Sequence, residues 1–227
     1  MDLFGYMRFT LCLFRNPKQQ KHLFRWLNSQ RKDYLCQRKI PWLVFDSIDF
    51  LNSLPLENKQ VFEYGSGGST LYWISRKMKC VSIEHDPIWY ESLRNNLNTS
   101  GGIDYRLVQP EIINPPISLD ITNPSLYISD DPTYRGYSFK KYVSQIDTFP
   151  HEYFDIVLID GRARPSCIMH SATKVKVGGF LILDNSDRYY YLDRTSTLLQ
   201  HFDKRTFNGV TPGATWFTET SVFMRKR

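Results

Sequence analysis

The sequence predicts an α/β protein whose mainly parallel sheet carries helices on both faces. Short runs rich in β-branched and aromatic residues alternate with segments whose apolar residues recur every three or four positions. One run, "FDIVLIDG" (154–161), is continuously apolar, as in a strand buried on both sides. Polar or glycine-rich residues follow each strand. In right-handed βαβ units ligands bind beyond the carboxyl ends of the strands, so these positions are the candidates for chemistry.

Each element follows from the same patterns. Two helices are expected before the sheet, over 18–35 and 42–53, with Pro41 at their junction. The predicted strands are 60–65, 79–86, 103–109, 154–161, 180–185 and 216–226. The predicted helices between them are 69–78, 87–97, 164–177 and 189–202, and Gly178 with Gly179 should close the third of these. The chain is therefore divided into a basic helical segment, 1–55, and an α/β domain, 56–227, with an irregular insertion over 110–150.

Composition bounds the class of protein. The content of 41% apolar and 23% charged residues is typical of a globular protein, and no apolar run is long enough to span a bilayer. The four cysteines form no CxxC pair, which indicates reduced thiols and a cytoplasmic location. The first residues, "MDLFGYMRFTLCLF", indicate neither a signal peptide nor an anchor, and an amphipathic segment lying on a surface is the alternative.

The net charge of +6 is unevenly distributed. Residues 1–41 hold nine Lys or Arg against two Asp, so this arm carries +7 and the remainder −1. A solvated helix face is the simplest interpretation, while nucleic acid, anionic lipid and an acidic protein stay open as partners. The two N-terminal helices also offer a surface for a homodimer.

The stretch "VFEYGSGGST" (61–70) predicts a cofactor site. Gly65, Gly67 and Gly68 join a strand to a helix whose first N–H groups are free to donate, although a tight turn without a ligand is the alternative. Glu84 ends the next strand, where a carboxylate can accept both hydroxyls of a ribose. Dinucleotides and S-adenosylmethionine both fit. Thr70 stands where a dinucleotide fingerprint has its third glycine, and Glu63 would repel a pyrophosphate, so an NAD-dependent oxidoreductase is the disfavoured alternative.

At this point the sequence resembles the class I S-adenosylmethionine-dependent methyltransferases. "VFEYGSGGST" and "VSIEHD" resemble the first two motifs of that family, "FDIVLIDGRARPSC" and "VGGFLILDN" its fourth and fifth strands, and "WFTETSVFMRK" its reversed last strand. The resemblance covers about residues 42–226 and implies a doubly wound, seven-stranded sheet with an antiparallel last strand. The cofactor-binding residues that it implies are Glu63, Gly65, Ser66, Gly67, Gly68, Ser69, Glu84, His85, Gln109 and Asp160.

A divalent ion is a further expectation. In the resemblance to catechol-type and macrolide-sugar O-methyltransferases, Asp160, Asp184 and Asn185 match the positions that hold a metal, and such oxygen ligands suit Mg²⁺. Arg162, Arg164 and Arg188 could instead neutralise the two aspartates. Asp160 and Arg162 are the predicted catalytic residues, and His85, His151 and His170 are candidate bases by residue type alone.

The insertion 110–150 is predicted to cover the acceptor as a lid, with Tyr134, Arg135, Tyr137 and Tyr142, although a helix from Ser138 that merely packs is the alternative. "NPPI" (114–117) resembles a motif of nucleic-acid methylating enzymes but precedes the fourth strand, so a loop is expected there. The predicted function is methyl transfer from S-adenosylmethionine, to an oxygen of a small molecule or sugar. Nucleic acid is not expected as the acceptor, and a nucleic-acid-binding module without turnover is the alternative from another class.

Overall fold

The computed structural model describes residues 3–97, 102–113 and 120–226. The strands are β1 Gln60–Tyr64, β2 Lys79–Glu84, β3 Ile103–Leu107, β4 Glu111–Ile112, β5 Tyr137–Ser138, β6 Phe154–Ile159, β7 Val175–Asp184, β8 Phe202–Val210 and β9 Phe217–Arg225. The α-helices are α1 Leu3–Arg15, α2 Leu23–Asn28, α3 Tyr34–Arg38, α4 Phe45–Asn52, α5 Gly68–Ser75, α6 Pro87–Arg94, α7 Lys140–Val143 and α8 Arg164–Ser171. Within these residues no helix is long and apolar enough to cross a membrane.

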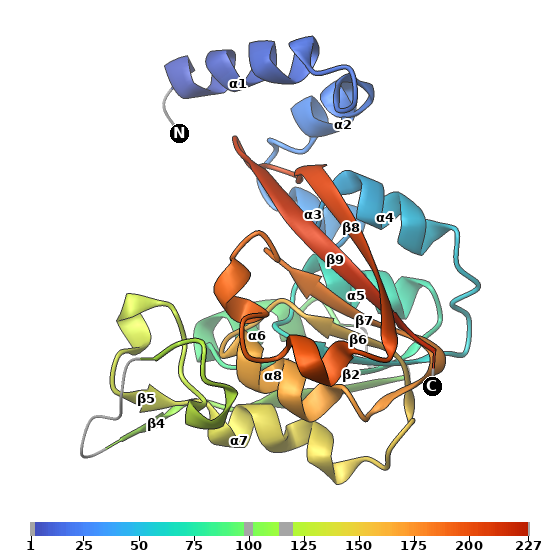
Figure 1. The fold of residues 1–227 in the computed structure, drawn as a ribbon. Helices are drawn as coiled ribbons and strands as arrows, with labels where there is room; N and C mark the ends of the chain where they lie inside the picture. Colours follow the sequence, from blue (N-terminus) through green and yellow to red (C-terminus); the bar gives the residue numbers. More distant parts are fainter. Residues whose placement is uncertain (1–2, 98–101, 114–119, 227) are drawn as a thin grey trace.

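The main sheet has the predicted doubly wound order. Its seven strands run β3-β2-β1-β6-β7-β9-β8 (Figure 1). β1, β2, β3, β6 and β7 pair in parallel, whereas β9 pairs antiparallel with both β7 and β8. The predicted reversal of the last strand is therefore confirmed. β8 is not among the predicted strands, because its exposed residues 203–206 are largely charged and give no apolar strand pattern.

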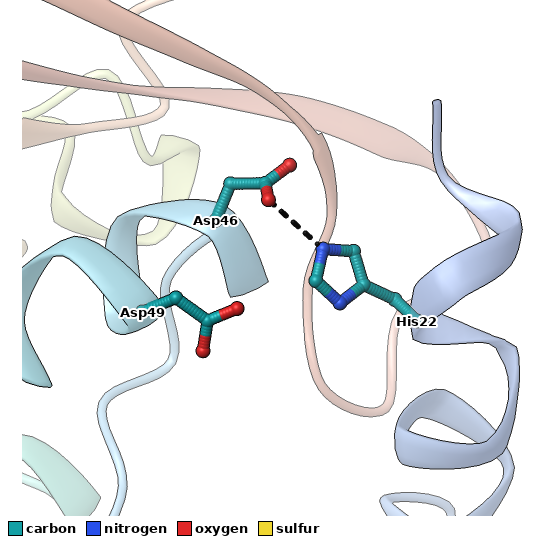
Figure 2. A group of neighbouring side chains, drawn as sticks. All are labelled: His22, Asp46 and Asp49. Carbon is teal, nitrogen blue, oxygen red and sulfur yellow. Dashed lines mark hydrogen bonds and ion pairs between the residues drawn. The ribbon is translucent and has the colours of Figure 1, made fainter. Parts of the chain in front are cut away.

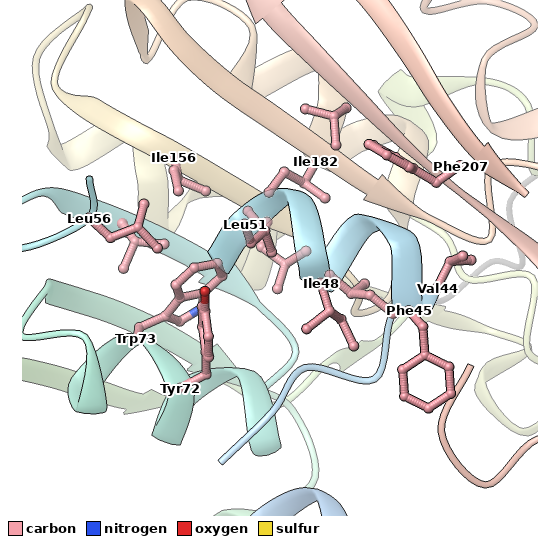
Figure 3. Close-up of a cluster of buried hydrophobic side chains, with 14 of the residues drawn as sticks. Val44, Phe45, Ile48, Leu51, Leu56, Tyr72, Trp73, Ile156, Ile182 and Phe207 are labelled. Atoms are coloured by element: carbon pink, nitrogen blue, oxygen red, sulfur yellow. The ribbon is translucent and has the colours of Figure 1, made fainter. Parts of the chain in front are cut away.

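Helices cover both faces of the sheet because strand side chains alternate between two cores. In β6, Ile156 and Leu158 join the cluster under α4 and α5, while Val157 and Ile159 join the cluster under α7 and α8. Figure 3 shows the first cluster, in which residues of α4 lie between α5 and strand residues such as Ile182. The continuously apolar run 154–161, predicted to form a strand buried on both sides, thus contributes to both cores.

The N-terminal region departs from the prediction of one helix over 18–35. A 3-10 turn (η1, Gln20–His22) leads into α2, and the chain breaks before α3 at Asp33, whose φ is +56°. Polar contacts with the loop after β8 fix this break: Trp26 Nε1 donates to the Ala214 carbonyl over 2.6 Å, and the Gly213 N–H donates to Ser29 Oγ. The predicted helix over 42–53 is present as α4.

Two predicted helices in the C-terminal half are wrong in extent or kind. α8 ends at Ser171, because Val175 already pairs with Phe154 and begins β7. Gly178, with φ of +77°, therefore lies inside β7 near an irregularity in its pairing, and closes no helix. The segment 189–202 forms only the 3-10 turns η5 Tyr189–Tyr191 and η6 Ser196–Leu199. Its apolar residues satisfied a helical period, but no continuous helix forms.

The insertion contains more structure than an irregular lid. β4 and β5 pair as a small antiparallel sheet at one side of the molecule (Figure 1), and the 3-10 turns η2 Pro124–Leu126 and η3 Pro132–Tyr134 precede β5. α7 and the 3-10 turn η4 Ser144–Thr148 then return the chain to β6, which agrees with the alternative of a packed segment after Ser138. The "NPPI" stretch at 114–117 lies outside the described residues.

Candidate active site

A cavity of about 640 Å³ lies beyond the carboxyl ends of β1, β2, β6 and β7. Most of the predicted site residues line it: Gly65, Ser66, Gly67, Gly68, Ser69, Glu84, His85, Asp160, Arg162, Asp184 and Asn185. Glu63 and Gln109 do not line it. The parallel strands thus bring four of the five predicted segments to one edge, and the fifth, at Gln109, does not reach the cavity.

The three glycines of the β1–α5 loop serve different purposes. Gly65 has φ of +89°, and a Cβ on it would lie 2.8 Å from the Gly161 Cα. A Cβ on Gly68 would lie 2.2 Å from the Ile40 carbonyl oxygen. Both are therefore required by the chain itself. Gly67 is extended, and the nearest atom to its added Cβ, on Trp89, is 4.0 Å away. Only Gly67 keeps open a space that the protein does not fill.

Glu84 lies at the centre of the cavity wall with its carboxylate held by the loop. Its Oε2 accepts from Ser66 N at 3.0 Å and Ser66 Oγ at 2.7 Å, and its Oε1 accepts from the N–H groups of His85 and Asp86. Burial raises the pKa of Glu84, but hydrogen bonds from His85, Asp86 and Ser66 outweigh it and leave this pKa below its ordinary value. Glu84 is therefore an ionised acceptor beside the loop.

Glu63 lies behind the loop, which corrects its predicted place at the cofactor. Its side chain is fully buried, and its carboxylate accepts from Thr70 Oγ1, Ser82 Oγ and Trp73 Nε1 over 2.6 to 3.1 Å. Thr70 Oγ1 in turn accepts from the Gly67 N–H at 2.9 Å. Glu63 thus supports the loop from beneath. Gln109, two residues beyond the end of β3, is likewise not brought to the cavity.

An arginine accompanies the two aspartates predicted to hold a metal. Arg164 donates to Asp160 Oδ1 at 3.1 Å and to the carbonyl oxygens of Gly161 and Asp184. Asp184 Oδ1 accepts from Thr220 Oγ1 at 2.6 Å, and Asn185 donates to Thr218. A buried guanidinium already compensates the carboxylates, so this set of groups does not fit Mg²⁺. The alternative interpretation, neutralisation by arginine, agrees with these contacts.

Both aspartates are harder to ionise than usual. Burial raises the pKa of Asp160 well above its ordinary value, and the Asp184 charge raises it further, against the opposing effect of Arg164. Burial raises the pKa of Asp184 to about 6. The side chain of Asp160 is 23% exposed toward the cavity, and no described side chain donates to its Oδ2. Asp160 therefore offers one free carboxylate oxygen to a bound molecule.

Arg162 connects the cavity to the insertion. Its guanidinium lies 3.0 Å from Asp131 Oδ2 and donates to His85 Nε2 at 3.3 Å. The His85 Nδ1 is 2.8 Å from Glu84 Oε1. Of the three candidate histidines, only His85 lines the cavity; His170 instead contacts Asp147 and Tyr127.

Three tryptophans at the cavity were missed from sequence. Trp42, Trp89 and Trp216 line it and are 50%, 43% and 56% exposed. Trp89 donates from Nε1 to the Ser66 carbonyl at 2.9 Å, so α6 holds the loop from the side. No pattern in the sequence marks these tryptophans, because their exposure and their convergence depend on the packing of three distant segments.

A second group of potential metal ligands lies away from this cavity. His22, Asp46 and Asp49 come together between the N-terminal helices and α4 (Figure 2), and they are the one cluster of three or more His, Cys, Asp or Glu ligands among the described residues. Lys21 pairs with Asp46 at 2.6 Å and Arg25 with Asp49 at 2.7 Å. These cations compensate the carboxylates, so the cluster is an ion-pair clamp and not a metal centre.

Comparison with known proteins supports the fold. No family model and no curated protein matches the sequence. A proposed O-methyltransferase from Klebsiella pneumoniae has a TM-score of 0.56 at 14% identity, over 86% of this chain and 89% of the other. The O-methyltransferase from Bacillus cereus, solved in complex with SAH, has a TM-score of 0.54 at 15% identity over 78% of each chain. The cofactor-bound protein Rv0187 from MTB has a TM-score of 0.54 at 15% identity, over 96% of this chain and 95% of the other.

These similarities extend over most of each chain, and the strand order with its reversed last strand agrees with them. The chain therefore has the fold of the class I S-adenosylmethionine-dependent methyltransferases.

Proposed function

We propose that the protein is an S-adenosylmethionine-dependent methyltransferase that acts on a hydroxyl oxygen of a small molecule or sugar. The observation that carries the proposal is the pairing of the open backbone at Gly67 with the ionised Glu84 in one cavity. Gly67 leaves room for a ligand at the start of α5, where free N–H groups can donate. Glu84 can exchange the Ser66 hydroxyl for the hydroxyls of a ribose.

The cofactor fits the charges of this cavity. S-adenosylmethionine supplies a methyl group on a positively charged sulfur, which leaves as a neutral thioether when an oxygen attacks the methyl carbon. Arg162, Arg164 and Arg188 line the cavity together with Asp160 and Asp184, and Arg164 pairs with Asp160. The ionised Glu84 lies beside the glycine loop with Asp86 next to it in sequence, and this part of the cavity suits a cofactor that bears positive charge. A dinucleotide would place its pyrophosphate at the glycine loop beside the ionised Glu84, which disfavours the oxidoreductase alternative.

Asp160 is the residue proposed to take the acceptor proton. Its Oδ2 receives no described donor, and its raised pKa makes the carboxylate a stronger base than a solvated aspartate. Arg162 lines the cavity with His85, is held by Asp131 of the insertion, and would orient the acceptor. The indoles of Trp42 and Trp216 also line the cavity and supply flat apolar surface, as a sugar or aromatic acceptor requires.

Calorimetry with S-adenosylhomocysteine and with NAD tests the proposal. We expect the wild-type chain to bind S-adenosylhomocysteine and not NAD. Glu84→Gln should weaken this binding by about 10- to 100-fold, because charged hydrogen bonds of about 1.5–3 kcal/mol are lost. Glu91→Gln, which changes an exposed glutamate on α6, is the matched control and should bind as the wild type does. Binding of NAD alone, or equal affinity of the Glu84 variant and the control, would refute the proposal.

A further inference from the structure

The outer face of α1 is a second apolar surface on a helix that already buries one. Phe9 and Leu13 face inward, with Phe9 against Trp26 and Phe217 at ring distances of 5.2 and 5.3 Å. On the opposite side, positions 4, 7, 11 and 14 recur with the period of one helix face. These residues are Phe4, Met7, Leu11 and Phe14, exposed by 74%, 58%, 55% and 62%.

Among the described residues, the charges beside this face are positive. Arg8 and Arg15 lie on the same side of α1, and Lys18 follows its end. None of the three forms an ion pair with another described residue, and all three are exposed, whereas Lys21 and Arg25 of the same arm are paired. No acidic residue occurs in α1. α1 therefore has an exposed apolar face with cations beside it that no described carboxylate pairs with.

We propose that α1 docks on a membrane surface that carries anionic lipids. A helix that presents Phe, Leu and Met on one face with Arg beside them is suited to lie in the interface between headgroups and acyl chains. The arginines would meet the negative potential of the lipids. A second copy of the chain fits less well, because its α1 would bring the same positive charges against these.

The proposed docking surface belongs to helices that contact one wall of the cavity. Phe217, Ala214 and Gly213 contact the N-terminal helices, and the loop that carries Ala214 and Gly213 also supplies Thr211 and Trp216 to the cavity wall. Figure 1 shows α1 and α2 beside the ends of β8 and β9, away from the β4–β5 sheet. A membrane docked on α1 would therefore lie at the end of the molecule where α1 and α2 contact the loop that forms this wall of the cavity.

Flotation of the full chain with vesicles tests the proposal. We expect the protein to float with vesicles of phosphatidylcholine and phosphatidylglycerol at a ratio of three to one, and not with phosphatidylcholine alone. Raising the salt to about 0.5 M should reduce the bound fraction, because the Debye length shortens. The double variants Met7→Ser/Leu11→Ser and Arg8→Glu/Arg15→Glu should each lower the partition coefficient at least about tenfold.

Val177→Ser is the matched control, because Val177 is an exposed apolar residue on β7 and far from α1 in sequence. It should float as the wild type does, and circular dichroism should show that every variant is folded. Three outcomes would overturn the proposal. They are failure of the wild type to float with the anionic vesicles, equal flotation of the α1 variants, and a dimer in sedimentation equilibrium that Met7→Ser/Leu11→Ser dissociates. Retention on duplex DNA that the apolar variant leaves intact, without flotation, would likewise assign the arm to nucleic acid.

Discussion

At the scale of single residues, spacing in the sequence does not distinguish glycines that a ligand needs from those that the fold needs. Gly65, Gly67 and Gly68 form one motif, yet two of them are explained by contacts with Gly161 and Ile40. Only the clearance around Gly67 remains for a ligand. The same holds for Glu63, whose position in the motif predicted a cofactor contact but whose burial assigns it to the support of the loop. Local sequence specifies the turn, and tertiary contacts decide which side of it faces the cavity.

Alanine substitutions at Gly67 and Gly68 separate these two roles. Gly68→Ala places a Cβ 2.2 Å from a backbone oxygen, so we expect it to lower the free energy of unfolding by about 1–3 kcal/mol. Gly67→Ala brings its Cβ no closer than 4.0 Å to any described atom and should change stability by less than about 1 kcal/mol. It should nevertheless weaken binding of S-adenosylhomocysteine at least about tenfold, because the added Cβ would occupy space in the cavity that the cofactor is proposed to fill. Urea unfolding and calorimetry on both variants measure this, and a Gly67→Ala protein with unchanged affinity would contradict it.

At the scale of elements, strands were easier to predict than helices. The runs that became β1, β2 and β6 are short and apolar, and each is bounded by glycine, proline or aspartate. The region 164–177 kept a helical period past Ser171, but pairing of Val175 with Phe154 extends the sheet instead. Such pairing is nonlocal, so no window of the sequence contains it. The edge strand β8 was not predicted, for a local reason: its charged, exposed residues give no apolar strand pattern.

Asp130 is a second carboxylate of the insertion, besides Asp131, that contacts an arginine of the cavity. Asp130 Oδ2 accepts from Arg188, Tyr190 and Tyr191 at 2.8 to 2.9 Å. Burial raises the pKa of Asp130, but these donors outweigh it and leave this pKa below its ordinary value. Arg188 also lines the cavity, so Asp130 ties the predicted lid to the segment after β7.

Asp130→Ala should therefore loosen the insertion without unfolding the protein. Loss of hydrogen bonds worth about 1.5–3 kcal/mol each should speed amide hydrogen exchange across residues 120–134 by about 10- to 100-fold. Peptides from β6 and α8 should exchange as in the wild type. Asp203→Ala is the control, because Asp203 lies on β8 and its ion pair with Lys226 is exposed. Unchanged exchange in 120–134 would mean that the apolar contacts of the insertion hold it without Asp130.

At the scale of the whole molecule, the N-terminal region shares a core with the sheet. Phe9, Leu13 and Trp26 belong to the same buried cluster as the strand residues Ile156 and Ile182. The ion-pair clamp of His22, Asp46 and Asp49 lies at the edge of this contact and joins the N-terminal helices to α4. Because the clamp is formed by residues that titrate, attachment of the N-terminal region should depend on pH.

Two residues of the clamp, His22 and Asp46, favour the folded state at neutral pH. Burial lowers the pKa of His22 below 6.5, against the opposing effect of Asp46, so the folded state favours the neutral imidazole. This contribution is complete above pH 6.5 and is lost as the pH falls below it, because the unfolded chain binds the proton first. Burial raises the pKa of Asp46, but Lys21 and His22 outweigh it and leave this pKa below 3.8. The contribution of Asp46 is therefore complete above pH 3.8 and is lost in stronger acid.

We expect the melting temperature of the wild type to fall between pH 7.5 and pH 5.0, and His22→Gln to fall less over this interval. The reason is that glutamine cannot take up the proton that burial penalises in His22. His201→Gln, a change at an exposed histidine on the turn before β8, is the control and should retain the wild-type dependence on pH. Differential scanning fluorimetry at matched ionic strength measures the three curves. If His22→Gln and the wild type fall in parallel, other groups dominate the acid sensitivity and the clamp does not control attachment of the N-terminal helices.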